Sequence, residues 1–122
     1  MRLQESGEMY LESIYVLSKK LGAVRSIDVS EYMGYSKPSV SRAVSLLKSA
    51  GYIVMNEETL ITLTDSGLAI AKKIYDRHTL LSELLIRLGV SEKTAVQDAC
   101  KMEHTISDET FEAIQRHMKQ YR

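Results

Sequence analysis

The stretch CKMEH, residues 100–104, brings together three side chains that bind metal ions. Cys100 is the only cysteine of the chain, and Glu103 and His104 follow it at three and four residues. On a helix, these spacings place side chains on one face. A thiolate, a carboxylate and an imidazole are ligands of divalent transition metals. Because one face of one helix seldom completes a metal site, we expect further ligands elsewhere in the chain.

Two other segments offer such ligands. Met9 and Glu12 stand three residues apart in EMYLES, and His78 lies in YDRHTLL. With CKMEH they give more donors than one ion needs, so some members could be alternatives or form a second site. The competing interpretation is ordinary packing, since a Met on an amphipathic helix and a lone buried Cys are usually core residues. Spacing alone does not decide between the two.

A helix-turn-helix pattern lies upstream of most of these residues. We expect a short helix over 26–33 with Ser26 as its N-cap, a turn at Gly34, and a second helix from its cap Ser36 to Gly51. The apolar stretches YIVM and LITLT then flank the polar NEET, which predicts a two-stranded wing. This order of elements is typical of a winged helix.

The rest of the sequence predicts three helices. The first is long, is capped by Thr64 or Asp65 and ends at Gly89, and the other two are capped by Ser91 and Ser107. The fold class is therefore mainly α with a small β wing. We expect an N-terminal winged helix-turn-helix domain over 1–63 and a helical domain over 64–122.

The second helix of a helix-turn-helix enters the major groove with its first residues at the base edges. Arg42 is the best candidate for base readout, because a guanidinium can donate twice to guanine, and Ser39 could also contact a base. Basic and hydroxyl side chains nearby could contact phosphates. A winged helix used only for protein contacts would more often carry apolar residues here. The predicted DNA-binding residues are Arg25, Ser36, Lys37, Pro38, Ser39, Arg42 and Lys48.

Composition restricts the class of protein. The 122 residues include 16 basic and 16 acidic ones, which argues against a strongly polycationic nucleic-acid binder but not against a local DNA contact. No apolar run approaches the ~18 residues of a transmembrane helix, so we expect no membrane partner. A single cysteine cannot form an internal disulfide, which fits the reducing cytoplasm.

Four segments together resemble the diphtheria toxin repressor and manganese transport regulator family of metal-dependent transcriptional repressors. They are EMYLESIYVL, SKPSVSRAVSLLKSAGYI, LTDSGLAIAKKIYDRHTLL and DACKMEHTISDE, in matching order over nearly the whole chain. The resemblance implies a metal-loaded homodimer that binds a palindromic double-stranded DNA operator and represses genes of metal homeostasis. It also implies that residues 64–122 bind metal and form the dimer. Candidate apolar dimer contacts are Leu80, Leu84, Leu85, Leu88 and Phe111.

The same resemblance implies a ligand set. The primary site of the family would fall on Met9, Cys100, Glu103 and His104. The iron-type branch has Met and Cys at the first two positions, as here. Glu12 and His78 match ligand positions of the manganese-type branch, so the chain combines features of both branches.

A departure from the iron branch bears on the number of ions, and the donor types bear on their kind. Ser82 and Val96 stand where the iron branch has a carboxylate and a histidine of its ancillary site, so we expect one dominant ion, or a pair built with Glu12 and His78. Thioether and thiolate donors favour softer ions, which makes Fe(II) the first choice and Mn(II) the second. No organic cofactor is expected.

Other functions compete with this prediction. A thiol-based redox regulator with a winged helix would use Cys100 without metal. A small metallohydrolase would need an open coordination position for water, but the sequence shows no nucleophile motif or glycine-rich phosphate loop. A winged helix that responds to a small organic ligand would leave the carboxylate and imidazole beside Cys100 unexplained. We therefore expect a regulator and not an enzyme.

Overall fold

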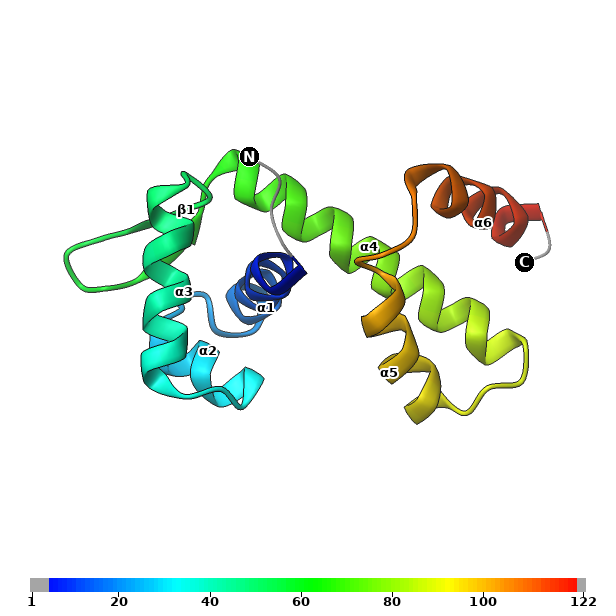
Figure 1. Ribbon diagram of the computed structural model, residues 1–122, viewed down its shortest axis with the longest axis horizontal. Coiled ribbons are helices and arrows are strands. Elements are labelled where there is room, and N and C mark those ends of the chain that lie inside the picture. The colour runs from blue at the N-terminus through cyan, green and yellow to red at the C-terminus, as the bar shows by residue number, and fades with distance from the viewer. Residues whose placement is uncertain (1–4, 121–122) are drawn as a thin grey trace. The chain divides into compact units, whose positions relative to one another are not determined.

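The computed structural model describes residues 5–120 and divides the chain into two compact units, one ending at Lys72 and the other beginning at Lys73. The predicted fold class, mainly α with a winged-helix N-terminus and a helical C-terminal part, is confirmed (Figure 1). None of the described helices is long and apolar enough to cross a membrane. The elements are α1 (Glu5–Leu21), α2 (Ser26–Met33), α3 (Lys37–Ser49), β1 (Ile53–Met55), β2 (Ile61–Leu63), α4 (Asp65–Arg87), α5 (Glu92–Met102) and α6 (Asp108–Gln120).

The first unit has one core beneath its three helices and the wing. Apolar residues at helical spacing on α1, α2 and α3 meet the inward-facing residue at the start of each strand, and each fully buried side chain of this kind contributes roughly 1.5–3 kcal/mol. α3 therefore has a fixed inner face and leaves its opposite face to solvent. The buried core includes Leu11, Ile14, Val29, Val40, Val44, Leu47, Ile53 and Ile61.

The wing is a short antiparallel hairpin. Ile53 pairs with Leu63, and Met55 with Ile61. The Ile61 N–H also donates to the Val24 carbonyl at 2.7 Å, so the segment between α1 and α2 adds one bridge to β2. This bridge holds the hairpin against the helices.

Most of the predicted helix caps are confirmed. The Ser36 hydroxyl accepts from the Ser39 N–H at 3.3 Å, and the caps of α4, α5 and α6 are Thr64, Ser91 and Ser107. The prediction for Ser26 is wrong by one position, since Ser26 is the first residue of α2 and Arg25 is its N-cap. The physical reason is the Asp28 carboxylate, which accepts from the Arg25 backbone N–H at 2.9 Å and fixes the start of the helix one residue earlier.

Candidate metal centre and DNA-reading helix

Glu103 lies at the centre of a polar cluster in the second unit. Its side chain is fully buried. Its Oε2 lies 2.8 Å from Nδ1 of His78 on α4, and its Oε1 lies 3.3 Å from Nε2 of His104. We call these three residues the Glu103 cluster. It places two imidazole nitrogens beside the two oxygens of one buried carboxylate.

The chain reaches this arrangement by ending α5 early. The helical spacing used for CKMEH extends to His104, whereas α5 ends at Met102 and Glu103 is its C-cap. The N–H groups of Thr105 and Ile106 both donate to the Met102 carbonyl, at 3.1 and 3.2 Å. His104 therefore lies in the turn that directly follows α5, where its ring meets the Glu103 carboxylate.

The other predicted ligands lie on two helices. Cys100 is on α5, three residues before Glu103, and is partly buried. Met9 and Glu12 are one turn apart on α1, in the first unit, and both are partly buried. The structure thus brings His78 together with Glu103 and His104, while the roles of the other three as ligands stay predictions.

The chemistry of the cluster fits a divalent transition metal. Imidazole and carboxylate are ligands of Mn(II), Fe(II) and Zn(II), and a thiolate on the same helix raises the preference for softer ions. Burying a carboxylate is costly unless it is paired or coordinates a metal. A buried carboxylate between two imidazoles is therefore suited to take an ion in place of their mutual contacts.

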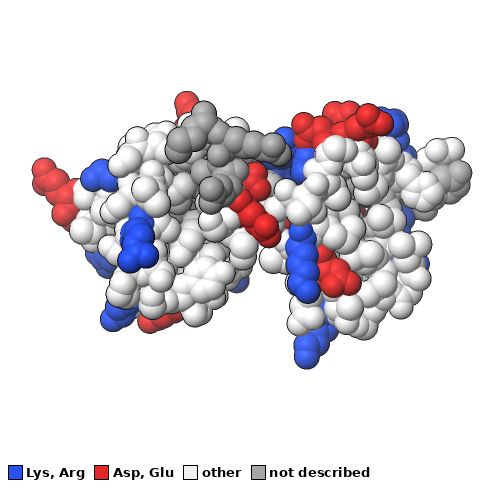
Figure 2. All heavy atoms as spheres, in the orientation of Figure 1, with Lys and Arg blue, Asp and Glu red and all other residues white. Residues whose placement is uncertain are grey.

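The predicted DNA-binding residues lie at the surface of the first unit. Every predicted DNA-binding residue is exposed, on α3, at its cap or at the cap of α2. The Ser36 hydroxyl both caps α3 and donates to Ser39 Oγ at 2.9 Å, so it is already used within the helix. On the face shown in Figure 2, the basic side chains of the first unit are scattered and do not form one continuous patch.

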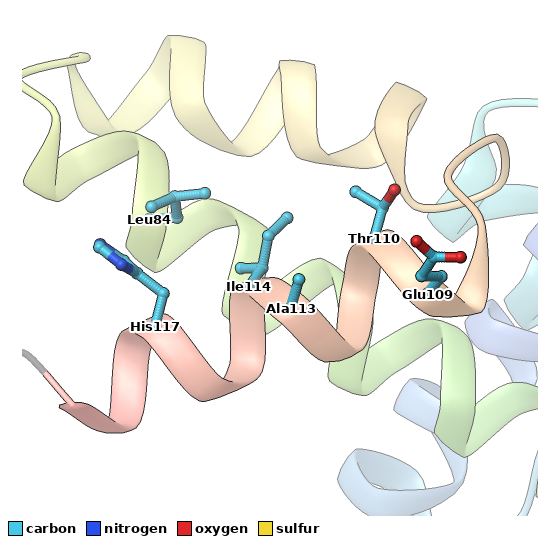
Figure 3. Close-up of a pocket in the computed structure, with 6 residues that line it drawn as sticks. All are labelled: Leu84, Glu109, Thr110, Ala113, Ile114 and His117. Atoms are coloured by element: carbon cyan, nitrogen blue, oxygen red, sulfur yellow. The ribbon is translucent and has the colours of Figure 1, made fainter.

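A groove runs along the second unit between α4 and α6 (Figure 3). Leu84 from α4 and Ala113 and Ile114 from α6 form its apolar part, and Glu109 and His117 lie at its edges. Its apolar residues come from two helices and lie open to the surface.

The predicted apolar dimer contacts include both accessible and buried side chains. Leu84 lines the groove and Leu88 is 71% exposed, so both are available to a partner. Phe111 is buried, and its ring centroid lies 5.3 Å from the Arg77 guanidinium carbon. Phe111 therefore belongs to the interior of the second unit.

Comparison with known proteins identifies both halves of the chain. The model of the iron-dependent repressor N-terminal DNA-binding domain matches residues 2–59, and that of the metal-binding and dimerisation domain matches residues 64–122. An uncharacterised HTH-type transcriptional regulator of Methanocaldococcus jannaschii is 33% identical over 98% of both chains. The chain belongs to the iron-dependent repressor family. The resemblance found in the sequence is thereby confirmed, as is the pairing of a DNA-binding domain with a metal-binding and dimerisation domain.

Other members of the family agree with this assignment. The transcriptional regulator MntR of Salmonella typhimurium is 35% identical over 105 residues, which are 86% of this chain and 67% of that protein. Among solved structures, the manganese regulator SloR matches with a TM-score of 0.83 at 27% identity, and the metal-dependent transcriptional regulator MtsR with 0.86 at 30%. The alignments cover 98% and 93% of this chain but only 55% and 53% of those chains, so it spans about half their length. MntR and MtsR are transcriptional regulators.

Proposed function

We propose that this protein is a cytoplasmic repressor which, as a homodimer loaded with a divalent transition metal, binds a palindromic operator and controls genes of metal homeostasis. The observation that carries the proposal is the buried Glu103 carboxylate between the imidazoles of His78 and His104. The exposed polar start of α3 supports the DNA-binding part. The proposed activity is binding alone, and no catalytic step is assigned to any residue.

The proposed ligands come from both units. His78, Glu103, His104 and Cys100 would hold the ion in the second unit, supported by their donor types and by the distances within the Glu103 cluster. Met9 and Glu12 would supply donors from the DNA-binding unit, supported by their spacing on α1 and by family membership. An ion shared in this way favours the DNA-binding state only by its greater affinity for that state.

Fe(II) is the proposed ion and Mn(II) the second choice. The thioether of Met9 and the thiolate of Cys100 favour the softer ion. Manganese is supported by the relative SloR, a manganese regulator, and by the solved structure of a manganese-dependent transcriptional repressor in complex with manganese. The Cys100 thiol must lose its proton to bind a metal ion, so affinity for either ion should fall at acid pH.

The dimer is proposed to form through the second unit, at the groove between α4 and α6. The apolar side chains Leu84, Ala113 and Ile114 support this position, together with the dimerisation domain that the family model describes. In such a dimer, two α3 helices would read half-sites about one DNA turn, ~34 Å, apart. Arg42 would contact a base edge, while Lys37, Arg25 and Lys48 would contact phosphates.

The test combines metal binding and DNA binding on one preparation. Under anaerobic conditions, the protein is titrated with Fe(II), Mn(II) and Zn(II), and each form is used to select duplexes from a random library, with a chelator as the metal-free arm. We expect selection of palindromic sequences only with metal, and loss of this selection in Glu103→Gln. Glu112→Gln is the matched control, since Glu112 is exposed on α6. Selection that is equally strong in chelator would refute the proposal.

A further inference from the structure

A buried arginine stands next to the Glu103 cluster. Arg77 precedes His78 on α4 and is only 5% exposed. Arginine is almost never this buried unless its charge is paired, and the Nε of Arg77 has no hydrogen-bond partner among the described residues, so the terminal nitrogens make the contacts. The partners of this guanidinium therefore show what the residue holds in place.

Those partners lie in and around the link between α5 and α6. Nη1 donates to the Glu103 carbonyl at 3.2 Å and to the Ile106 carbonyl at 2.9 Å, and Nη2 donates to the Asp108 carboxylate. The Phe111 ring packs against the guanidinium. The acceptors span residues 103–108, so one side chain of α4 holds the whole link.

Two neighbouring residues of α4 contact Glu103, one at its side chain and one at its backbone. His78 contacts its carboxylate, and Arg77 binds its carbonyl. That carbonyl lies at the C-terminus of α5, where helix carbonyls lack helical partners and where a positive charge is favourable. The backbone of the cluster is thus fixed independently of the side chains that would meet an ion.

We propose that Arg77 is the positioning residue of the metal centre, an inference that rests on the proposed metal binding. It does not touch the ion, but it holds the link that carries Glu103 and His104, so that the carboxylate and the imidazole are in place before metal arrives. Partners of this outer kind typically change metal affinity by about 10–100-fold when they are removed.

Lysine cannot replace arginine in this role. The guanidinium is a rigid planar fork that reaches two carbonyls and a carboxylate at once, whereas an ammonium is a single point on a flexible stem. Arg77→Lys therefore keeps a positive charge near Asp108 and loses the simultaneous hydrogen bonds to the Glu103 and Ile106 carbonyls. Arg87→Lys is the matched control, because Arg87 lies on the same helix and pairs with Glu83 in an i,i+4 contact that lysine can also make.

The experiment measures Co(II) binding to the full chain by competition with a chelator and records the visible absorption of the bound Co(II). Thermal unfolding of the metal-free protein is measured as well, to compare the folding of each variant with that of the wild type. For Arg77→Lys we expect at least a tenfold loss of Co(II) affinity and a changed d–d absorption, since that absorption reports ligand geometry. Arg87→Lys should match the wild type in both.

A second measurement needs no variant. The N–H groups of Glu103, Thr105 and Ile106 donate to carbonyls in the last turn of α5, and positioning requires them to be protected from hydrogen exchange before metal is added. Protection that arises only with metal overturns the inference, even if Arg77→Lys fails to fold.

Two results separate this inference from the proposed function. If the wild type binds Co(II) and Arg77→Lys binds it with equal affinity and an unchanged spectrum, Arg77 has only a structural role and this inference alone fails. If the wild type binds no Co(II), the proposed function fails and the inference with it.

Discussion

At the start of α4, tertiary packing should outweigh the preference of a helix for alanine over glycine. Gly67 lies in the first turn of α4, and a Cβ added there would come within 2.0 Å of the Tyr52 carbonyl oxygen and 3.0 Å of its carbon. The same oxygen accepts from the Thr64 N–H at 3.0 Å. A glycine is therefore required here by the close approach of another backbone segment.

The effect of Gly67→Ala follows from three terms. An ordinary contact between the added Cβ and the Tyr52 carbonyl oxygen is about 3.4 Å, so the two backbones would have to separate by roughly 1.4 Å. A close-packed interior has no free space to accommodate this shift. Overpacking of this kind costs about 1–3 kcal/mol, and the Thr64–Tyr52 hydrogen bond, worth about 1 kcal/mol, is lost. The better helix propensity of alanine returns about 1 kcal/mol. The free energy of unfolding should thus fall by about 2 kcal/mol.

Thermal unfolding followed by circular dichroism in a chelator tests this value. For a chain of this length, a loss of about 2 kcal/mol lowers the melting temperature by roughly 8 °C. The control is Ala69→Gly at an exposed position of the same helix, which should cost only about 1 kcal/mol by propensity. A Gly67→Ala protein that melts at or above the wild-type temperature would show that the reasoning from backbone contact is wrong.

Three further predictions concern DNA, metal and pH. Arg42→Ala should weaken binding to a selected operator by about 1–3 kcal/mol relative to random duplex, whereas Lys37→Ala should weaken binding to the two duplexes alike and reduce the salt slope by about one. Competition titrations over a salt series measure the two effects. An equal loss on the two duplexes for Arg42→Ala would contradict base readout. Metal at about 100 times its Kd should stabilise the wild type by about 2.7 kcal/mol, and Glu103→Gln should lose most of the resulting rise in melting temperature; an undiminished rise would exclude Glu103 as a ligand. The hydrogen bond and charge of Lys73, and then the charge of Arg77, lower the pKa of Asp108 from its ordinary 3.8, so its stabilising effect is present above pH 3.8 and is lost as the pH falls through the lower folded-state pKa. The melting-temperature gap between wild type and Asp108→Asn should therefore be full at pH 6 and shrink at acid pH, and a gap that stays constant down to pH 2 would contradict this assignment.

Local chemistry made much of the fold predictable. The cap at Ser36, the left-handed glycines that end helices, such as Gly34 and Gly89, and the apolar spacing of α3 act within a few residues. Patterns of this range can be read without knowing what else packs nearby. The misplaced cap at Ser26 shows the limit even at short range, because Asp28 offers a competing contact that fixes the helix start at Arg25.

The candidate metal centre was only partly predictable. CKMEH identified Glu103 and His104 by type and spacing, although α5 ends at Met102, one residue before Glu103. Helix termination there depends on the turn that follows α5, and its carbonyls are held by Arg77 from α4, 26 and 29 residues away in sequence. Arg77 itself carried no signal in the sequence, because an arginine next to a histidine on a long helix is usually at the surface.

The sequence by itself determined the order of elements, the exposed and buried faces of α3, the donor types of the metal centre and the family. These depend on residue identity and on spacing along one helix or strand. Only the tertiary structure decided that one buried carboxylate stands between His78 and His104, that Arg77 holds its backbone, and that Gly67 has no room for a side chain. Apart from the contact between the adjacent Glu103 and His104, these contacts join residues more than ten positions apart, and their cost or gain arises when water is excluded between segments that the sequence does not show to be neighbours.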